Sequence, residues 1–466
     1  MCVMSRDISG NRVMDQIVDY LSDYAAALSF NDLPAEVVHH AKRLLIDTLG
    51  CAIGGYPSAP SKMARALAAT VMSQQPATVL GSGQQTSLEL ATFANGVMMR
   101  YLDYNDGYTG KESGHPSDAI AAVLSPAEVA HGDGRSVITA TVLAYEVFCR
   151  LCDAVCVRDR GFDHVTIGVM ASTLAAAKAL GLSRDQMRQA LNLSVTANLA
   201  LYQTRIGEVS LWKGCAFANA SRNAVFAVLL AALGMTGPAP IFTGAGGFFH
   251  TVSREPFTLG PFGGQGQPFK ILECIIKRFP LGLYSQTVVD AALQVRQHLA
   301  SVDEIQEVHV ATLQTAVKIM AGDPEKWHPT NRETADHSMP YTTAVALMYG
   351  TVEPRHFEAE YWRNPRLLEL VQKVQVQVSE EANRRAPEAM LSRVEVVTAS
   401  GGRHTAEVAY HRGHFKNPMS DQEVEDKFRT LAYGLLTPAQ ISTVLERLWH
   451  LEQVPDIGEV IRMVHI

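Results

Sequence analysis

The sequence predicts a mainly α-helical protein in which a smaller α+β domain interrupts a large all-helical domain built from both chain ends. Apolar residues recur at helical spacing from Met14 to about Leu233, and again from about Asp421 onward. Between these parts, short segments alternate apolar and polar residues, as strands with one buried face do. With 466 residues, 47% of them hydrophobic, the chain can supply the core that this arrangement needs.

The N-terminal part is expected to be nearly all helical. Runs such as residues 37–55 and 140–156 keep helical spacing, and Gly and Pro separate the runs. Two further runs, residues 169–182 and 218–234, are rich in small side chains. Small side chains let helix axes approach closely, so we expect these two helices to be central.

A Gly/Pro-rich segment, residues 243–268, marks the change of pattern and is predicted to connect the domains. Strand-like alternation follows in three segments: 302–314, 367–380 and 391–411. In the third segment Ser400-Gly401-Gly402 separates two alternating runs, which predicts a hairpin. The sequence thus divides into a helical part (1–267), an α+β domain (268–415) and a helical return (416–466).

Composition excludes several classes of function. The charged fraction is 19% and the formal net charge is −7, so nothing attracts a nucleic acid or a membrane surface. The most apolar run, residues 224–235, is too short to span a bilayer. The first 18 residues lack the apolar core of an export signal, and seven scattered cysteines do not resemble a secreted disulfide framework. We therefore expect a cytoplasmic protein.

Three cysteines, Cys149, Cys152 and Cys156, raise the question of a metal or iron–sulfur cluster. Their spacing of i, i+3 and i+7 puts them on one face of a predicted helix, where free Cys usually packs as a small apolar residue. A cluster needs loop geometry that lets thiolates converge. The other cysteines, Cys2, Cys51, Cys215 and Cys274, form no second pair. We expect core packing, with no metal and no other cofactor.

The most informative stretch is residues 101–124. Asp103, Asp106, Glu112, Asn105 and His115 fall within 13 residues between two apolar helical runs. Loops held by rigid helices often carry catalytic groups. The alternative is a solvated loop whose Ser117 or Asp118 caps the next helix, and we expect at least one of them to do so.

Three other short polar segments interrupt the apolar helical pattern, and we call them and the loop polar islands. His164 stands just before a helix of small residues, where a lone His is more often a helix neighbour than a catalyst. Lys213 opens a close-packed helix, where burial requires an anionic partner or ligand. The fourth island offers Arg332, Asp336, His337 and Tyr341 before another apolar helix.

Residues 102–120, LDYNDGYTGKESGHPSDAI, resemble the signature loop of the MmgE/PrpD family, specifically its 2-methylcitrate dehydratase branch. GFDHV, LWKG, KRFP followed by SQTVVDAAL, and DHSMPY are also similar to family positions, so the resemblance covers nearly the full chain. It implies a large helical domain, a smaller α+β lid domain, a homodimer and an active site between the domains.

Members of this family act on small polycarboxylates without a metal, by dehydrating 2-methylcitrate, decarboxylating cis-aconitate or epimerising iminodisuccinate. The resemblance therefore implies a hydro-lyase on a 2-methylcitrate-like tricarboxylate, with His as acid and base. Its candidate catalytic residues are Asp103, His115, His164, Lys213 and Tyr341. Its candidate substrate-binding residues are Asp106, Lys277, Arg278 and His337, and we expect Lys213 to pair with a substrate carboxylate.

The sequence departs from the family at Gly107, where a Thr is usual, and in residues 200–212, which we expect to shape a different pocket. A decarboxylase or an epimerase on the same fold remains open, because the same acid–base groups serve all three reactions. From other classes, a non-catalytic helical scaffold or binding protein and a cluster-dependent hydratase also remain. Polar islands that do not converge would favour the scaffold, and iron in the pure protein would favour the hydratase.

Overall fold

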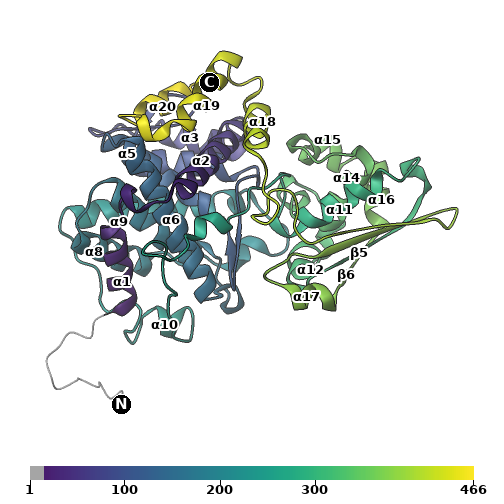
Figure 1. Cartoon of the computed structure of the whole chain (residues 1–466), viewed down its shortest axis with the longest axis horizontal. Helices are drawn as coiled ribbons and strands as arrows, with labels where there is room; N and C mark the ends of the chain where they lie inside the picture. The colour runs from purple at the N-terminus through teal and green to yellow at the C-terminus, as the bar shows by residue number, and fades with distance from the viewer. Residues whose placement is uncertain (1–14) are drawn as a thin grey trace.

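The computed structural model describes residues 15–466 and confirms a mainly helical fold with a small mixed sheet (Figure 1). Two large hydrophobic cores are present among these residues. The first is built from residues between Ile17 and Ile276 and from residues between Met419 and Val464. The second is built from residues between Ile275 and Val408. We call these parts the helical domain and the lid domain; the domain limits given above remain a prediction.

The N-terminal part of the helical domain contains most of its helices. They are α1 (Gln16–Ala27), α2 (Ala35–Gly55), α3 (Ala59–Ala68), α4 (Leu88–Arg100), α5 (Ala121–Val129), α6 (Gly134–Ala154), α7 (Val165–Ala179), α8 (Arg184–Ala197), α9 (Ala216–Ala232) and α10 (Phe248–Thr251). A short ladder joins β1 (Ala77–Thr78) to β2 (Gln85–Thr86). None of the helices within residues 15–466 combines the length and apolar character needed to cross a membrane.

Of the two small-residue helices, α7 is central, as predicted, whereas α9 packs on it and exposes Phe226 on its other face. Every side chain of α7 from Val165 to Ala177 is buried. A Cβ added at Gly168 would lie 2.3 Å from Cε2 of Phe217 on α9, so the glycine is what allows the two helices to approach. These helices form the rigid base on which the loops of the site rest.

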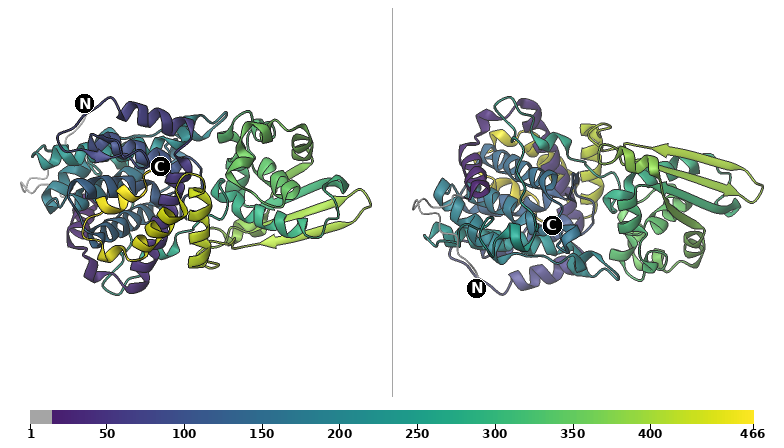
Figure 2. Two further views of the ribbon diagram at one scale, coloured as in Figure 1. Left: turned by 90° about the horizontal axis from the view of Figure 1, so that it is seen from above. Right: turned by 90° about the horizontal axis from the view of Figure 1, so that it is seen from below.

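The chain returns to the helical domain at its C-terminal end, as predicted, through α18 (Asp421–Ala432), α19 (Pro438–Trp449) and α20 (Gly458–Met463). Figure 1 and Figure 2 show these helices against the N-terminal ones, with α18 on the side that faces the lid. A Cβ added at Gly50 of α2 would lie 3.1 Å from Cδ2 of Phe428, so α18 packs closely on α2. Asp47 and Lys427 form a buried ion pair of 2.6 Å across this contact.

The Gly/Pro-rich segment 243–268, which was predicted to connect the domains, packs against the helical domain. Phe248 and Phe262 are buried in the core of the helical domain. The backbone N–H groups of Gly263 and Lys270 donate to the buried carboxylate of Glu146 on α6 at 2.8 and 2.7 Å. Four aromatic side chains spaced irregularly along the segment bury it, and irregular spacing gives no helical or strand signal.

The lid domain contains a four-stranded sheet in the order β6-β5-β7-β8. Its strands are β5 (Ile305–Thr312), β6 (Val374–Val378), β7 (Ser392–Thr398) and β8 (Arg403–Val408). β5 pairs with β6 in parallel and with β7 antiparallel, so that Val310 lies opposite both Val376 and Val394. The β7–β8 hairpin turns at Ser400–Gly402, as predicted, and Gly401 takes a positive φ of 85°.

Helices cover the lid sheet. They are α11 (Gln286–Arg296), α12 (Gln314–Met320), α13 (Arg332–Ala335), α14 (Met339–Tyr349), α15 (Ala359–Trp362), α16 (Pro365–Gln372) and α17 (Glu380–Arg385). α16 corrects the prediction that residues 367–380 are strand throughout. Pro365 opens this helix and the Asn364 side chain caps it, while Leu367, Leu370 and Val371 provide a buried helical face.

The cysteine stripe is only partly as predicted. Cys149 and Cys152 are fully buried on α6, but α6 ends at Ala154, so Cys156 lies beyond the helix and is partly exposed. The Sγ atoms of Cys149 and Cys274 lie 3.8 Å apart, a contact that the sequence spacing did not reveal. Cys2 lies outside the described residues, as does most of the N-terminal stretch on which the expectation about export rests.

Candidate active site

The polar loop after α4 is folded by its own side chains. β3 (Tyr108–Thr109) and β4 (Ser113–Gly114) form a short hairpin that leads into a 3₁₀ turn at Pro116–Ala119. The amide of Asn105 donates to Ser117 Oγ and Asp118 Oδ1 at 2.9 and 2.7 Å. Ser117 in turn donates through its N–H and hydroxyl to Asp106 Oδ1. Ser117 and Asp118 are therefore not helix caps, which corrects the prediction.

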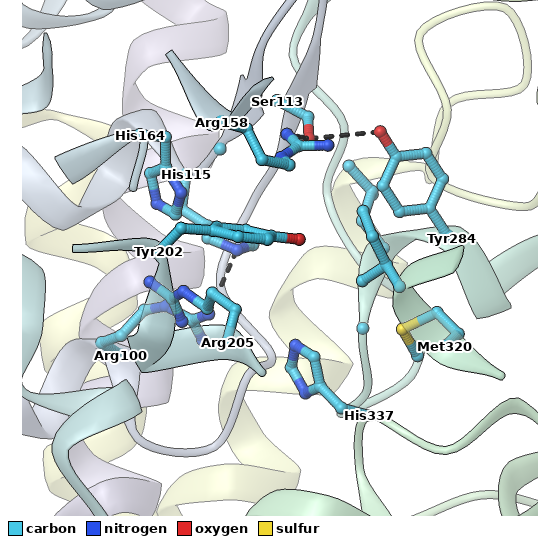
Figure 3. Close-up of a pocket in the computed structure, with 14 residues that line it drawn as sticks. Arg100, Ser113, His115, Arg158, His164, Tyr202, Arg205, Tyr284, Met320 and His337 are labelled. Atoms are coloured by element: carbon cyan, nitrogen blue, oxygen red, sulfur yellow. Dashed lines mark hydrogen bonds between the residues drawn. The ribbon is translucent and has the colours of Figure 1, made fainter. Parts of the chain in front are cut away.

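A cavity of about 70 Å³, which we call the inner cavity, lies between this loop and the lid (Figure 3). Among the described residues, its wall contains three guanidinium and three imidazole groups and no carboxylate. The lining residues are Arg100, Ser113, Gly114, His115, Arg158, His164, Tyr202, Arg205, Gly282, Leu283, Tyr284, Ile319, Met320 and His337. Such a wall attracts an anion, because nothing on it repels negative charge.

His115 has a fixed hydrogen-bonding arrangement. Its Nδ1 lies 2.6 Å from the carbonyl oxygen of Asp106, an atom that can only accept, so Nδ1 carries the proton. Its Nε2 lies 3.1 Å from Nη2 of Arg100, which can only donate. Burial and the neighbouring charges of Arg100 and Lys277 lower the pKa of His115 well below its usual value. His115 is thus a neutral imidazole whose Nε2 lone pair accepts a hydrogen bond from Arg100 at the cavity wall.

His164 faces His115 across the cavity wall, with ring centroids 5.8 Å apart and an interplanar angle of 72°. Its Nδ1 lies 2.8 Å from Oδ1 of Asp163, so this nitrogen donates to a buried carboxylate. Its Nε2 is buried and has no hydrogen-bond partner within residues 15–466. A buried ring nitrogen without a partner is costly unless a bound molecule supplies one.

Each guanidinium of the wall is held by a buried carboxylate. Arg100 donates to Asp103 at 2.8 Å, Arg205 to Asp163 at 2.6 Å, and Arg158 to Glu112. All three carboxylates are fully shielded from solvent. Such pairs fix the direction of each guanidinium while leaving further N–H groups for a ligand.

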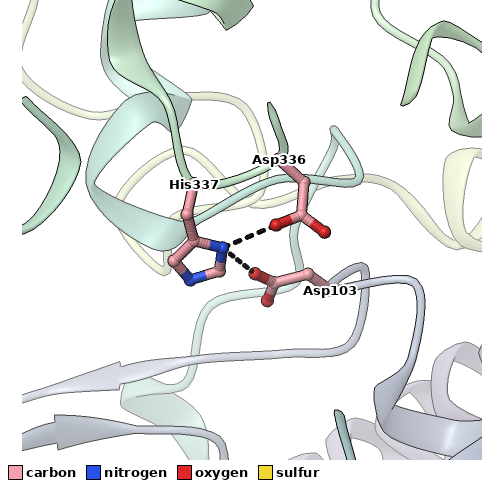
Figure 4. A group of neighbouring side chains, drawn as sticks. All are labelled: Asp103, Asp336 and His337. Carbon is pink, nitrogen blue, oxygen red and sulfur yellow. Dashed lines mark hydrogen bonds and ion pairs between the residues drawn. The ribbon is translucent and has the colours of Figure 1, made fainter. Parts of the chain in front are cut away.

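Behind the wall, Asp103 is the centre of a buried charge cluster. Its backbone takes a positive φ of 50°, a conformation that Asp tolerates better than most residues. Lys277 Nζ donates to Oδ1 of Asp103 at 2.6 Å and to the backbone carbonyl of Asp103 at 2.9 Å. His337 Nδ1 lies 3.2 Å from its Oδ2 and 2.6 Å from Oδ1 of Asp336 (Figure 4). The loop residue Asp103 thereby joins the helical domain to the lid.

Asp103, Asp336 and His337 offer three atoms within 4.8 Å of one another, the spacing of a possible metal site. Lys213 Nζ, however, lies 2.6 Å from Asp336 Oδ1, 3.5 Å from Asp103 Oδ2 and 3.0 Å from His337 Nδ1. The ammonium stands where a cation would have to bind, and it would repel a divalent ion. These residues therefore do not fit a metal centre.

The charges of this cluster determine its protonation. Although burial opposes ionisation, Arg100, Lys277 and Lys213 hold the pKa of Asp103 well below its usual value. Burial and the charge of Lys213 lower the pKa of His337 to about 4. Near neutral pH the cluster therefore contains an ionised Asp103 carboxylate and a neutral His337 imidazole.

The chain matches the models of two domains of a known protein family. Residues 19–259 match the model of the MmgE/PrpD N-terminal domain, and residues 279–451 match that of the MmgE/PrpD C-terminal domain. The chain belongs to the MmgE/PrpD family. The resemblance carried by residues 102–120 is thereby confirmed for the family as a whole.

Named relatives of this MmgE/PrpD chain carry different activities in their names. The 2-methylcitrate dehydratase of Cupriavidus necator is 28% identical over 382 residues, 77% of this chain and 75% of the relative. The cis-aconitate decarboxylase of Homo sapiens is 25% identical over 468 residues, 95% and 93% of the two chains. A 2-methylcitrate dehydratase-like protein of Aspergillus oryzae is 28% identical over 475 residues, 94% and 92%.

The structure of this MmgE/PrpD chain brings several predicted site residues to one place. His115, His164 and His337 line the inner cavity. Asp103, Lys213 and Lys277 lie directly behind it in the charge cluster, each at most 1% exposed. Lys213 therefore pairs with Asp336 rather than standing free at the wall for a substrate carboxylate.

Three other predicted residues do not line the cavity. Asp106 supports His115 through its carbonyl and binds Ser117 through its carboxyl group, whose pKa burial raises to about 7. The side chain of Arg278 is 49% exposed and faces Asp290. The hydroxyl of Tyr341 donates to the carbonyl of His356 at 2.5 Å inside the lid core. Tyr341 and Arg278 are therefore placed away from the inner cavity.

The most important omission of the sequence prediction is the set of guanidinium groups. Arg100 and Arg158 end or follow apolar helices, where an Arg is ordinarily a solvated helix end. Arg205 and Tyr202 lie in residues 200–212, which were expected to shape the pocket, so that signal was available. The Gly107 departure is also visible: a Cβ there would lie 3.0 Å from Cδ2 of Leu283, which lines the cavity.

Proposed function

We propose that this protein is a lyase that removes water from a small 2-methylcitrate-like tricarboxylate by His-based acid–base catalysis. The observation that carries the proposal is the inner cavity, whose wall combines three arginines and two facing histidines with no carboxylate. The names of the relatives, 2-methylcitrate dehydratase and cis-aconitate decarboxylase, supply the substrate class and the class of reaction.

In the proposed reaction, the arginines bind the carboxylates of the substrate. Arg100, Arg158 and Arg205 each keep N–H groups beyond the one that a buried carboxylate uses, and guanidinium groups bind carboxylates in bidentate fashion. Binding several carboxylates fixes the carbon skeleton relative to the two imidazoles. Fixed orientation itself contributes to the rate, because the reacting groups no longer have to find each other.

His115 is the proposed base. When the Arg100 N–H that donates to Nε2 turns to a substrate carboxylate, the Nε2 lone pair takes the proton from the carbon next to a carboxylate. The electrons of that C–H bond form the new C=C bond. The neutral state of His115 suits this role, since Arg100 and Lys277 disfavour a charged ring before the reaction. Its Nδ1–H bond to the Asp106 carbonyl keeps the ring oriented.

His164 is the proposed acid. As the C–O bond breaks, its Nε2–H gives a proton to the departing hydroxyl, which leaves as water. In this role Nε2 carries the proton that it gives, while Nδ1–H stays bonded to the carboxylate of Asp163. The unpartnered Nε2 supports the assignment, because a substrate hydroxyl would satisfy it. Proton exchange with solvent then restores both rings.

The proposed reaction uses no metal. The support is the Lys213 ammonium, which occupies the centre of the Asp103, Asp336 and His337 group. A second candidate function is decarboxylation of cis-aconitate. The human relative of that name aligns with 95% of this chain, against 77% for the Cupriavidus necator dehydratase. In that reaction a C–C bond breaks to release carbon dioxide, and a charged imidazole protonates the carbon left behind.

A direct assay tests the proposal. Purified protein is incubated with 2-methylcitrate, citrate or cis-aconitate, with and without excess chelator, and the products are identified by NMR and mass spectrometry. Loss of one water from 2-methylcitrate, unaffected by chelator, is the expected result. Release of carbon dioxide from cis-aconitate alone would establish the second candidate. Absence of turnover of all three substrates, or turnover that chelator abolishes and iron restores, would overturn the proposal.

We also propose that the protein forms a homodimer. Large apolar side chains are exposed within residues 199–235, among them Leu201 at 63% and Trp212 at 48%. Contiguous exposed apolar side chains mark interaction surfaces in soluble proteins. Tyr202 and Arg205 of the inner cavity lie in the same segment, so a dimer contact there would order part of the cavity wall.

A further inference from the structure

A second cavity lies beside the inner one, between the helical domain and the lid. Its volume is about 330 Å³, more than four times the 70 Å³ of the inner cavity. We call it the outer cavity. Arg158, Tyr284 and Ile319 line both cavities, so the two are neighbours that share one wall.

The outer cavity has an apolar floor and a charged mouth. Leu313 and Met390 of the lid are buried, at 6% and 3% exposure, and Ile319 and Ala386 of the same lining are half-buried, whereas Pro387 is exposed. The charged side chains of the lining other than Arg158, namely Lys111, Asp159 and Lys318, are exposed. A cavity that is apolar inside and charged at its opening suits an apolar group that is attached to a polar molecule.

The shared wall consists of side chains that meet across the two domains. Tyr284 of the lid donates through its hydroxyl to Ser113 Oγ at 3.2 Å, and Arg158 donates to the same atom at 2.8 Å (Figure 3). The two cavities are thus separated by side chains and not by backbone. A molecule whose carboxylates bind Arg158 on the inner side can therefore extend past Tyr284 into the outer cavity.

We propose that the outer cavity binds an unbranched alkyl substituent of the substrate, so that the preferred substrate is a 2-alkylcitrate with a chain longer than methyl. The inference rests on the proposed function, because the carboxylate end of that substrate occupies the inner cavity. The inner cavity has no room for such a chain, whereas the outer cavity supplies an apolar surface next to the reacting carbon. Each methylene buried there strengthens binding by up to about fourfold.

The experiment compares kcat/KM for 2-methylcitrate and 2-hexylcitrate in four proteins. Thr315→Trp and Lys318→Trp each place a large ring in the outer cavity from helix α12. Gln314→Trp is the matched control, since Gln314 is exposed on the same helix and lines neither cavity. Because Lys318 is exposed, Lys318→Trp remains usable if Thr315→Trp fails to fold.

The expected result is a hexyl-to-methyl ratio of about tenfold or more in the wild type and in Gln314→Trp. The ratio should fall toward one in Thr315→Trp and Lys318→Trp. A wild-type ratio near one, or a high ratio that neither filling variant lowers, would overturn the inference while leaving the proposed function intact.

A binding measurement separates the inference from the proposed function. Calorimetry compares propane-1,2,3-tricarboxylate with its hexyl-substituted form, neither of which can lose water. If neither citrate reacts but the hexyl ligand binds about tenfold more tightly and Thr315→Trp or Lys318→Trp abolishes the gain, the inference holds and the proposed reaction is wrong. Equal binding of the two ligands would overturn the inference.

Discussion

At the residue scale, the two facing histidines of the inner cavity, His115 and His164, differ in the atom that Nδ1 contacts. His115 donates to a neutral carbonyl and has Arg100 and Lys277 as charged neighbours, so it is held neutral. His164 donates to the buried carboxylate of Asp163, and its Nε2 has no hydrogen-bond partner within residues 15–466. Two histidines 5.8 Å apart therefore suit opposite roles in one proton-transfer reaction.

We predict that His115→Asn and His164→Asn each lower kcat by about 10² to 10⁴, the usual contribution of a positioned acid or base. KM should change little, because the arginines bind the substrate. The double variant should be far less impaired than the product of the single effects, since both groups act in one step. Steady-state kinetics with His309→Asn, on β5, as control measures this. Multiplicative effects of the two substitutions would argue that the rings act independently.

A second prediction concerns pH. Because the pKa of His115 lies well below the ordinary 6.5, the ring stays neutral as pH falls through 6.5 and gains its proton only at much lower pH. Base activity from His115 is therefore retained on the acidic side of neutrality. Nitrogen-15 NMR of the ligand-free protein should show a protonated Nδ1 and an unprotonated Nε2 at pH 6. Two protonated ring nitrogens at that pH would contradict the assignment of His115 as base.

At the element scale, α18 fixes two backbone segments next to the site, although none of its residues lines the inner cavity. Lys427 is 3% exposed and pairs with Asp47 of α2 at 2.6 Å. Its ammonium also donates to the carbonyls of Tyr104 and Lys277 at 2.7 and 2.9 Å. One cation of the C-terminal helix thus fixes the backbone beside Asp103 and at Lys277, two segments far apart in sequence.

We predict that Lys427→Met lowers the free energy of unfolding by about 3 kcal/mol, because it leaves Asp47 buried and unpaired. Asp47→Asn in the same chain should recover part of this loss, since the amide is neutral. The kcat should remain low in both variants, because both carbonyls still lack their donor. Denaturant unfolding and kinetics measure the two effects, with the exposed Lys416→Met as control. Recovery of kcat together with stability would show that Lys427 has no positioning role.

At the scale of the whole molecule, the site exists only where the two domains meet. The inner cavity takes His115, His164 and Arg205 from the helical domain, and Tyr284, Met320 and His337 from the lid. The backbone crosses between the domains near Ile275, whose N–H and carbonyl pair with those of Gly107 in the signature loop. A change in the angle between the domains would therefore move Tyr284, Met320 and His337 relative to the two proposed catalytic histidines.

We predict that the protein is a dimer in solution and that Leu201→Glu with Trp212→Glu makes it monomeric, because charges on a buried contact cost more than the contact contributes. Light scattering measures the mass. Met72→Glu, at a side chain 97% exposed on the turn after α3, is the control and should leave the mass unchanged. A wild-type monomer, or a dimer unaffected by the double substitution, would place the exposed apolar side chains of residues 199–235 outside the dimer contact.

The sequence alone determined the helical class, the hairpin of the lid, the C-terminal return and the family, because periodicity and motif order are local properties of the chain. The same local rules did not indicate that residues 243–268 pack into the helical domain, and they misjudged residues 367–372. The first is buried by aromatic groups without regular spacing, and in the second a helix cap outweighs alternation.

For the site, too, some features could be predicted from the sequence and others could not. The loop of residues 101–124 and the islands around His164 and Lys213 were recognisable because polar residues stand out between apolar helices. Only the tertiary structure decided that Lys213 faces Asp336, that Tyr341 belongs to the lid core, and that Arg100, Arg158 and Arg205 line one cavity. The reason is physical: sequence states which charges the chain contains, but whether a charge meets a substrate or a buried partner depends on distances between segments that only folding sets.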